Sequence, residues 1–404
     1  MTSERTRVRD KESLFILQRV LLESGGCQGM SDVRLCLTVN DTWPPPIGWR
    51  KNRREKLRSY EALHQKCGLN TELYRESIRQ LTSNRSGGSP TECNYVVWLP
   101  QHGLGNRMIS ITSTFLYALL NDKVLLLFFP DCMNGLFCEP FPNTTWLLPS
   151  DFPITHMTSI FDKDPNRYGN LLRDKILRND MNITNASIPL PAYLYLHLVH
   201  NNNDYDRMLY CEDAQLLLRQ FPWLLLRSNQ YFVPALFLIP MFEQELSLLF
   251  PERTTVFHLL GRYLFHPSNA VWGHVTSLKS EYFERIRDTY YRNATATGEV
   301  IGVYQPSHEE KQFTEKLDHN VKALAEIYLL SLSDSLITSQ YSTFGYVAQG
   351  LGGIRPWLLV RPDDENLCLQ SSTMEPCFHF PPSFECKSRS EMDLGSVVPY
   401  LRHC

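Results

Sequence analysis

The chain has 404 residues, of which 43% are hydrophobic and 21% charged, a composition that excludes a disordered or fibrous protein. Its 40 basic and 43 acidic residues give a net charge of -3. This balance argues against nucleic acid as the main partner, because phosphate binding requires a basic excess. The length suits two or three domains.

Residues 1–52 are predicted to form a poorly ordered leader. Basic residues at Arg5–Arg9 precede an apolar stretch at Leu14–Leu22, an order that resembles a signal peptide. Gln18 and Arg19 interrupt that stretch, however, so the pattern favours an exposed amphipathic segment. No run reaches the roughly 18 apolar residues that a spanning helix needs. No N-terminal membrane anchor is therefore visible in the sequence.

Residues 53–92 are predicted to be a helical segment followed by a linker. Apolar residues recur at near-helical spacing from Lys51 to Leu81, and Cys67-Gly68 divides this stretch into two helices. Residues 82–92 are rich in Ser, Gly, Asn and Pro, which is typical of a linker.

Residues 93–280 are predicted to form a Rossmann-like N-terminal half. A buried strand at Tyr95–Leu99, a tight loop at Gln101–Arg107 and an apolar helix at Met108–Leu120 lead into a second buried strand at Val124–Phe129. Continuous apolar strands alternating with a helix indicate a parallel sheet. The right-handed crossover places the glycine loop at the carboxyl edge of that sheet, where ligands bind. Residues 150–275 suggest short, mixed helices and strands.

Residues 281–366 are predicted to be a second and shorter α/β half. We expect a strand at Val300–Tyr304, a helix at Lys322–Ile337, a loop entering a helix at Ser339–Gln349 and a final strand at Trp357–Val360. Residues 367–404 form a Cys-rich tail.

The glycine loop Gly103-Leu-Gly-Asn-Arg107 follows a strand and opens a helix. Such a loop lets the backbone approach a ligand, and the free N–H groups of the helix start attract anions. The third glycine of a dinucleotide fingerprint and the Lys-Ser/Thr of a Walker loop are both absent. A ligand site and a purely structural turn both stay open, and a nucleotide-dependent oxidoreductase is a distant alternative.

Ser342 and Thr343 precede the helix of the second half and are good N-cap residues. The same hydroxyls and helix N–H groups could hold a diphosphate without a metal. Two Asp-x-Asp triplets, Asp162–Asp164 and Asp204–Asp206, do not end strands, so solvated loops are expected there rather than a metal site. The candidate bases for sugar transfer are His197, His200, Glu212 and Asp213. The pattern assigns none of them a catalytic role.

Eleven cysteines and six glycosylation sequons favour a secretory-pathway lumen. Four cysteines crowd the tail, at Cys368, Cys377, Cys386 and Cys404, and disulfides explain them better than a metal bound with His379 and His403. The candidate glycosylation sites are Asn40, Asn84, Asn143, Asn182, Asn185 and Asn293.

Together these motifs resemble the plant fucosyltransferase family that includes xyloglucan fucosyltransferase. The resemblance runs from about Arg53 to Cys404 with one gap. Its main segments are Tyr95–Trp98, Gly103–Arg107, Phe115–Leu120, Leu136–Pro142, Trp146–Pro153, Tyr195–His200, Asn229–Pro234, Val256–Pro267, Thr297–Val303, Lys322–Glu326, Ser342–Gly353 and Met374–His379.

The resemblance implies a GT-B-type glycosyltransferase, with two Rossmann-like halves facing a cleft. Such an enzyme transfers fucose from GDP-fucose to a cell-wall polysaccharide or proteoglycan, xyloglucan or an arabinogalactan, with inversion and without a metal or other cofactor. It implies a Golgi lumen or membrane location, with a homodimer or complexes with other Golgi glycosyltransferases as open alternatives. Gly103, Gly105, Asn106 and Arg107 would lie on the acceptor side of the cleft. Ser342, Thr343 and Phe344 would contact the nucleotide.

The chain departs from the family between residues 275 and 299. Family members have here a strand and an Arg-bearing loop that holds the donor diphosphate, whereas Glu281–Tyr291 is expected to be helical. The C-terminal half is therefore expected to be incomplete by about two β–α units, or roughly 60–70 residues. Loss of this loop makes activity doubtful and leaves a second hypothesis, a non-catalytic family member that binds glycan or a partner enzyme.

Overall fold

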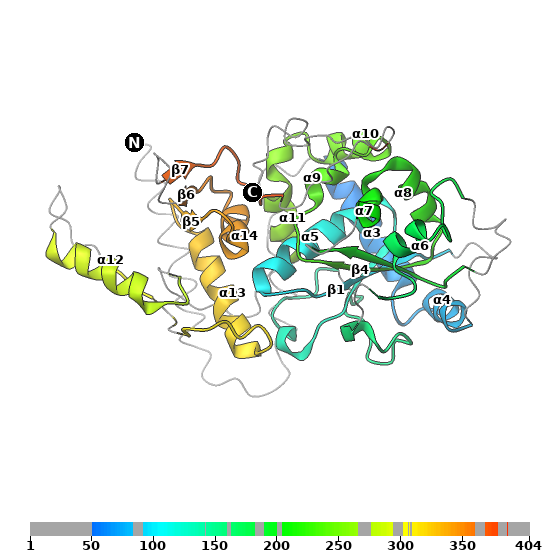
Figure 1. The fold of residues 1–404 in the computed structure, drawn as a ribbon, viewed down its shortest axis with the longest axis horizontal. Helices are drawn as coiled ribbons and strands as arrows, with labels where there is room; N and C mark the ends of the chain where they lie inside the picture. Colours follow the sequence, from blue (N-terminus) through cyan, green and yellow to red (C-terminus); the bar gives the residue numbers. More distant parts are fainter. Residues whose placement is uncertain are drawn as a thin grey trace.

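The computed structural model describes residues 51–83, 92–141, 143–159, 163–181, 190–199, 204–265, 276–293, 302–305, 307, 309–359, 368–378 and 386. These residues form two lobes (Figure 1). The larger lobe contains the helices α3 (Lys51–Cys67), α4 (Glu72–Thr82), α5 (Leu104–Leu120), α6 (Tyr168–Arg173), α7 (Asp204–Arg207), α8 (Glu212–Arg219), α9 (Val233–Leu236), α10 (Pro240–Leu249) and α11 (Val256–Leu264). Its strands are β1 (Tyr95–Leu99), β2 (Val124–Leu127), β3 (Leu194–Leu198) and β4 (Trp223–Ser228). Short 3-10 turns occur at Asp131–Met133, Met157–Ser159, Met208–Tyr210 and Arg253–Thr255.

The four strands of this lobe form a parallel sheet in the order β2-β1-β4-β3. Every residue in these strands is buried. Successive side chains of β1 enter two different cores: Val96 and Trp98 pack with α5, whereas Tyr95 and Val97 pack toward α4. The Tyr95 ring stacks on Trp223 of β4, with ring centroids 4.2 Å apart. The predicted β–loop–α–β unit is present, and both faces of its sheet are covered, as parallel sheets require.

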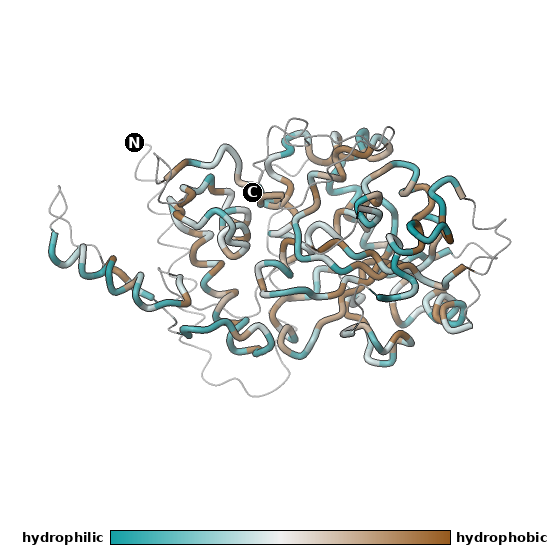
Figure 2. The backbone as a smooth tube through the Cα atoms, in the orientation of Figure 1, coloured by the Kyte–Doolittle hydropathy of each residue, from teal (hydrophilic) through white to brown (hydrophobic). Residues whose placement is uncertain are grey.

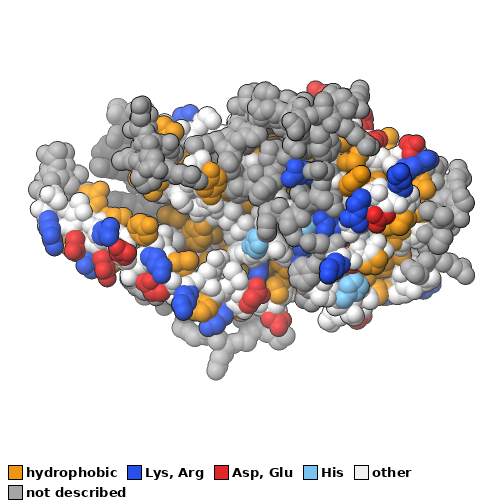
Figure 3. Space-filling model, viewed as in Figure 1, with side chains coloured by type: hydrophobic (Ala, Val, Ile, Leu, Met, Phe, Trp, Pro, Cys, Tyr) orange, Lys and Arg blue, Asp and Glu red, His pale blue; other side chains and the backbone are white. Residues whose placement is uncertain are grey.

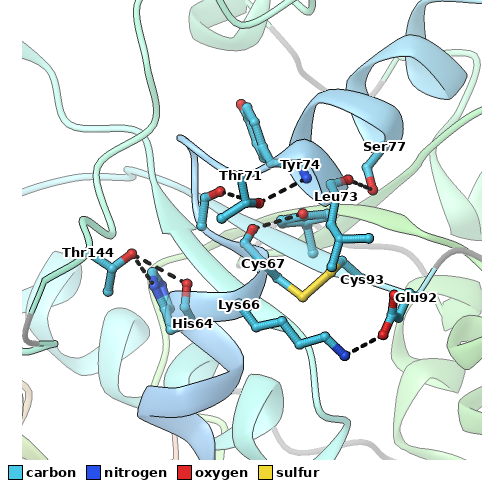
Figure 4. The surroundings of a disulfide bond; sticks show 12 residues. His64, Lys66, Cys67, Thr71, Leu73, Tyr74, Ser77, Glu92, Cys93 and Thr144 are labelled. Carbon is cyan, nitrogen blue, oxygen red and sulfur yellow. Dashed lines mark hydrogen bonds and ion pairs between the residues drawn. A yellow bond between two sulfur atoms is a disulfide. The ribbon is translucent and has the colours of Figure 1, made fainter.

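The predicted helices before this sheet are present and are fastened to it. A disulfide joins Cys67, the last residue of α3, to Cys93 just before β1 (Figure 4). The Tyr95 hydroxyl donates to the Cys67 carbonyl over 2.9 Å. Lys66 also forms an ion pair with Glu92. The segment before the sheet is thus held to β1 by a covalent bond and by polar contacts.

The smaller lobe contains α12 (Ser280–Arg292), α13 (Leu317–Ser331), β5 (Ile337–Ser339), α14 (Thr343–Gly352), β6 (Trp357–Leu359) and β7 (Cys368–Gln370). Its sheet has the order β5-β6-β7, with β5 and β6 parallel and β6 and β7 antiparallel. The helix predicted at Glu281–Tyr291 is confirmed as α12.

Several predicted boundaries were wrong. Helix α5 begins at Leu104 rather than Met108, because Gly103 already has extended backbone and serves as its N-cap. The strand predicted at Val300–Tyr304 is not formed at Gly302–Tyr304, and Val300 and Ile301 lie outside the described residues. Helix α13 covers 317–331 rather than 322–337, and Ile337 begins strand β5. The strand at Trp357 is followed by β7 and is not the last.

The tail is joined to the larger lobe. Cys386 forms a disulfide with Cys211, the residue before α8, and Cys377 is also disulfide-bonded. Cys368 is free, while Cys404, His379 and His403 lie outside the described residues. The prediction of disulfides in the tail is confirmed for Cys377 and Cys386 and was wrong for Cys368.

Candidate functional site

The two lobes meet where the N-termini of α5 and α14 face each other. The Thr343 hydroxyl donates to Asn106 Oδ1 over 3.1 Å. A Cβ added to Gly105 would lie 2.8 Å from the Thr343 carbonyl carbon, so only glycine allows the two helices to approach this closely. Each helix start presents backbone N–H groups and the positive end of its dipole. This junction is therefore suited to an anion.

A cavity of about 390 Å³ opens at this junction. Its volume lies in the range of small-molecule sites. It is lined by Gly103, Leu104, Gly105, Asn106, Thr276, Ser277, Leu278, Ser307, Glu309, Gln312, His319, Asn320, Lys322, Ala323, Glu326, Tyr341, Ser342, Thr343 and Phe344.

The wall formed by α13 carries the charged groups of the cavity. Lys322 Nζ lies 2.6 Å from Glu309 Oε1, and this ammonium group lowers the pKa of the Glu309 carboxyl. Glu326 is buried and accepts a hydrogen bond from the Ser307 hydroxyl over 2.5 Å. Burial raises the pKa of Glu326. The lysine that faces the cavity is thus already paired with a carboxylate, which reduces the net positive charge available to a diphosphate.

The predicted donor-side residues Ser342, Thr343 and Phe344 all line the cavity. Ser342 also caps α14, because its hydroxyl accepts from the Gly345 N–H over 3.2 Å. This segment can therefore be both a helix cap and part of a diphosphate site, the two interpretations that the sequence allowed. A capping hydroxyl leaves the remaining N–H groups of the helix start free for a ligand.

The predicted acceptor-side residues divide into two groups. Gly103, Gly105 and Asn106 line the cavity, whereas Arg107 lies buried behind them. The Arg107 guanidinium donates to the His102 carbonyl at 2.8 Å and to Cys132 Sγ at 3.2 Å, and it pairs with Glu315 at 2.7 Å. Arg107 thus links the two lobes from within the wall.

The predicted candidate bases lie elsewhere. His197 is buried on β3, where its Nδ1 lies 2.6 Å from the Tyr195 hydroxyl. Glu212 and Asp213 are exposed at the start of α8, and His200 lies outside the described residues. None of the three described side chains lines the cavity between the lobes.

The expectation of solvated loops at the Asp-x-Asp triplets was wrong for the second triplet. Asp206 lies in α7, is buried and forms an ion pair with Arg167. In the first triplet, Asp164 is also buried and accepts from the Asn166 N–H over 2.8 Å, while Asp162 lies outside the described residues. Within the described ranges, no three His, Cys, Asp or Glu side chains gather as metal ligands do.

Two candidate glycosylation sites can be placed. Asn143 and Asn293 are exposed, as a glycan acceptor must be, whereas Asn40, Asn84, Asn182 and Asn185 lie outside the described residues. Among the helices that the structure describes, none is both long and apolar enough to cross a membrane.

Sequence reasoning missed the contribution of α13 to the cavity. His319, Lys322 and Glu326 follow one another at spacings of three and four, so they share one face of the helix. This polar stripe, which continues into the mainly apolar C-terminal part of the helix, was the available signal.

A family model described as Xyloglucan fucosyltransferase matches residues 51–277 and 274–387. The chain belongs to this family. A galactoside 2-alpha-L-fucosyltransferase of Pisum sativum is 41% identical and aligns with 86% of this chain and 73% of its own length. Fucosyltransferase 2 of Arabidopsis thaliana is 42% identical over 86% of this chain and 78% of its own. The chain is therefore a glycosyltransferase of the fucosyltransferase type.

A solved structure of a mutant of Arabidopsis thaliana FUT1 in complex with GDP has the same fold. It is 38% identical, with a TM-score of 0.81, and the match covers 94% of this chain and 96% of that chain. The fold of this xyloglucan fucosyltransferase-family protein is accordingly of the GT-B type.

The family match is interrupted where the sequence predicted a missing segment. Its two parts meet at residues 274–277, immediately before α12. The alignment with the pea relative extends over 423 positions, more than the 404 residues of this chain, so that relative has residues with no counterpart here.

Proposed function

We propose that this protein transfers fucose from GDP-fucose to a galactose-bearing plant cell-wall glycan, xyloglucan or an arabinogalactan-type glycan, in the Golgi lumen. The supporting observation is the cavity between the N-termini of α5 and α14. Its donor-side wall contains Ser342, Thr343 and Phe344, and its opposite wall contains Gly103, Gly105 and Asn106. The curated relatives named as fucosyltransferases and the GDP complex of a structural relative favour the same donor.

In the proposed reaction, an acceptor hydroxyl oxygen attacks fucose C1 from the side opposite GDP, so the configuration inverts. The bond between C1 and the β-phosphate oxygen breaks, GDP leaves with the electron pair, and the proton of the acceptor hydroxyl passes to solvent water. The N–H groups at the start of α14 and the Ser342 and Thr343 hydroxyls would stabilise the developing negative charge. This stabilisation requires no metal.

We further propose that transfer is slow. The Arg-bearing loop that the family resemblance implies has no counterpart among the residues that line the cavity. The three arginines of the segment after the break lie on α12, where Arg285 pairs with Glu281, and Arg287 and Arg292 pair with Asp288. Removing one preorganised group of this kind costs about 100- to 1000-fold in rate in comparable sites.

The test is a transfer assay with purified protein, radiolabelled GDP-fucose and a galactose-terminated xyloglucan oligosaccharide. We expect incorporation at least about 100-fold slower than with the pea relative, which has residues with no counterpart here. Inserting that relative's additional segment after Thr276 should restore most of the difference, and the same insertion without its arginine should not. A rate equal to the relative's in the uninserted chain would overturn the proposal of slow transfer.

The second candidate function is binding without catalysis. It is favoured by the contrast between the larger lobe, whose sheet is covered on both faces, and the smaller lobe, before which the family match is interrupted. Calorimetry with GDP and with the oligosaccharide separates the two candidates. Acceptor binding without GDP binding or fucose incorporation would favour the non-catalytic function.

A further inference from the structure

One lysine supplies the permanent positive charge of the cavity between the lobes. Among the described residues that line this cavity, Lys322 is the only lysine or arginine, whereas Glu309 and Glu326 both bring carboxyl groups to it. Figure 3 shows blue and red side chains interspersed along the lower edge of the smaller lobe, so this face presents no extended basic surface. Attraction of an anionic ligand by a permanently charged side chain of the cavity therefore depends on Lys322.

Glu309 is the present partner of this lysine. The Lys322 Nζ lies 2.6 Å from Glu309 Oε1, and this hydrogen bond raises the pKa of the lysine and lowers the pKa of the carboxyl. The Lys322 side chain is 55% exposed, whereas the Glu309 side chain is 21% exposed. The carboxylate is thus the more confined member of the pair, and the lysine has room to change its partner. Exposed ion pairs are weak, so the exchange costs little.

The backbone before α13 directs two neighbouring carboxylates to different partners. Glu310 has a φ of 55°, in the left-handed region that residues other than glycine rarely adopt. Its carboxyl accepts a hydrogen bond from the Ser280 N–H over 3.0 Å at the start of α12, while Glu309 lines the cavity. Unfavourable backbone of this kind occurs most often at functional sites. The turn at Glu310 is what places Glu309 beside Lys322.

A second group of the cavity has unmet hydrogen-bonding capacity. His319 lies three residues before Lys322 on the same face of α13 and lines the cavity. Its Nδ1 atom is buried and has no hydrogen-bond partner among the described residues, since Glu309 Oε2 is 3.9 Å away. Figure 2 shows hydrophilic residues where α13 begins and hydrophobic residues along the rest of the helix. Because buried polar atoms without partners are uncommon, the start of α13 is suited to a polar ligand.

We propose that Lys322 binds the diphosphate of the nucleotide donor, and that Glu309 holds this lysine until the donor arrives. This inference rests on the proposed function, in which GDP-fucose occupies the cavity. On donor binding the Lys322 ammonium group leaves the Glu309 carboxylate and donates to a phosphate oxygen. Lys322 is then a substrate-binding residue, whereas Glu309 is a positioning residue whose charge opposes binding.

The chemistry of the two partners favours this exchange. Lysine carries its charge on a flexible four-carbon stem, so its ammonium group can change partner without a movement of α13. A diphosphate carries more negative charge than one carboxylate and attracts the ammonium group more strongly. The N-terminus of α14 lines the same cavity, so one diphosphate can contact both the lysine and the N–H groups of this helix start. The exchange leaves the Glu309 carboxylate without its cation, which weakens donor binding.

The first test compares GDP with guanosine by calorimetry on the purified full chain. Guanosine has no phosphate, so a change that acts through Lys322 should alter the dissociation constant for GDP alone. We expect Glu309→Gln to tighten GDP binding at least about threefold and to leave guanosine binding unchanged. Glu310→Gln is the matched control, because this neighbouring carboxyl faces α12 and its loss should leave the binding of both ligands unchanged. Unchanged or weaker GDP binding by Glu309→Gln would overturn the proposal.

The second test asks whether Glu309 acts through the lysine. Lys322→Gln should weaken GDP binding and leave guanosine binding unchanged. In that background Glu309→Gln should tighten GDP binding less than it does in the wild-type chain, because no lysine is left to release. An equal gain in both backgrounds would show that Glu309 acts only by its own charge, and would refute the exchange.

The fucose transfer assay separates this inference from the proposed function on which it rests. We expect Glu309→Gln to lower the KM for GDP-fucose by a factor similar to that for the dissociation constant of GDP. Transfer by the wild-type chain together with an unchanged GDP affinity in Glu309→Gln would refute the role of Glu309 alone. If neither the wild-type chain nor any variant bound GDP, both the inference and the proposed function would be refuted.

Discussion

The two sheets of this protein are built from short, largely parallel strands, yet they differ in how they are covered. In the β2-β1-β4-β3 sheet every strand residue is buried. In the β5-β6-β7 sheet, residues of one face remain exposed. The family match is interrupted at residues 274–277, between α11 of the larger lobe and α12 of the smaller lobe. The comparison teaches that two sheets with similar apolar strands can differ in how much of that apolar surface the neighbouring elements bury.

The largest expected effect is a difference in stability between two leucine-to-alanine variants, one in each sheet. Leu225 of β4 is fully buried, so Leu225→Ala should lower the free energy of unfolding by about 2–5 kcal/mol. Leu359→Ala should change it by no more than about 0.5 kcal/mol, because the Leu359 side chain is already half exposed to solvent. Urea denaturation of dilute protein measures both. Equal losses of stability in the two variants would mean that the Leu359 side chain is buried in solution.

The next largest effect concerns Glu375, through which the tail contacts the larger lobe. Glu375 is buried, and it accepts hydrogen bonds from the Tyr231 hydroxyl and, at 2.9 Å, from the Phe257 N–H. Burial raises the pKa of this carboxyl to about 8, so the folded protein holds the neutral acid. Its contribution to stability is complete below the ordinary pKa of about 4.5 and is lost as the pH rises toward 8.

The variant Glu375→Gln tests whether stability falls, as predicted, when the pH rises. Glutamine resembles the neutral acid, so the variant should lose the fall in stability that this group causes between about pH 4.5 and 8. The wild-type chain should lose up to a few kcal/mol over the same window, measured by urea denaturation at a series of pH values. If both proteins showed the same pH dependence of stability, the contact between the tail and the larger lobe would not depend on protonation of the Glu375 carboxyl.

A smaller effect is expected where the lobes touch. In Gly105→Ala the new methyl group would lie 2.8–2.9 Å from backbone atoms of Thr343 and Phe344, which cannot move without shifting α14. We expect a loss of about 1–3 kcal/mol, partly offset because alanine favours a helix by about 1 kcal/mol. Gly103→Ala is the matched control, because its methyl group would meet side chains rather than backbone: the end of the exposed Gln312 side chain and, at 3.4 Å, the Thr314 methyl group. Thermal unfolding measures both, and equal losses would show that the close contact is unimportant.

The sequence predicted the elements whose signals are local. The apolar run at Tyr95–Leu99 is a strand, and the run at Val124–Phe129 is a strand as far as Leu127. Ser342 caps the helix that was expected after it. The interruption of the family pattern was also predicted, because a helix-forming sequence stood where a strand and loop were expected. These features depend on periodicity, capping chemistry and order along the chain.

The rest depends on contacts between distant residues. The pairing of Cys211 with Cys386 spans 175 positions, and no local pattern encodes it. The first turn of α13 was missed because it is polar; Asn320 is buried there by donating to the Cys132 and Thr314 carbonyls. The pairing of Arg107 with Glu315 behind the cavity wall likewise required the two lobes to be placed together.

The smallest expected effect concerns the ion pair between Arg107 and Glu315, which links the two lobes behind the cavity wall. Glu315 is 70% exposed, whereas its partner Arg107 is buried and keeps its hydrogen bonds to His102 and Cys132 without it. Solvent screens such a pair, so Glu315→Gln should cost about 0–1 kcal/mol, and added salt should reduce the difference further. Arg107→Ala should cost more, because it leaves the His102 carbonyl without this donor inside the wall. Urea midpoints of the two variants at low and high salt measure this contrast. The opposite result would be a loss of stability in Glu315→Gln that is as large as in Arg107→Ala and does not change with salt. It would show that the ion pair between the lobes, rather than the buried hydrogen bonds of Arg107, stabilises this wall.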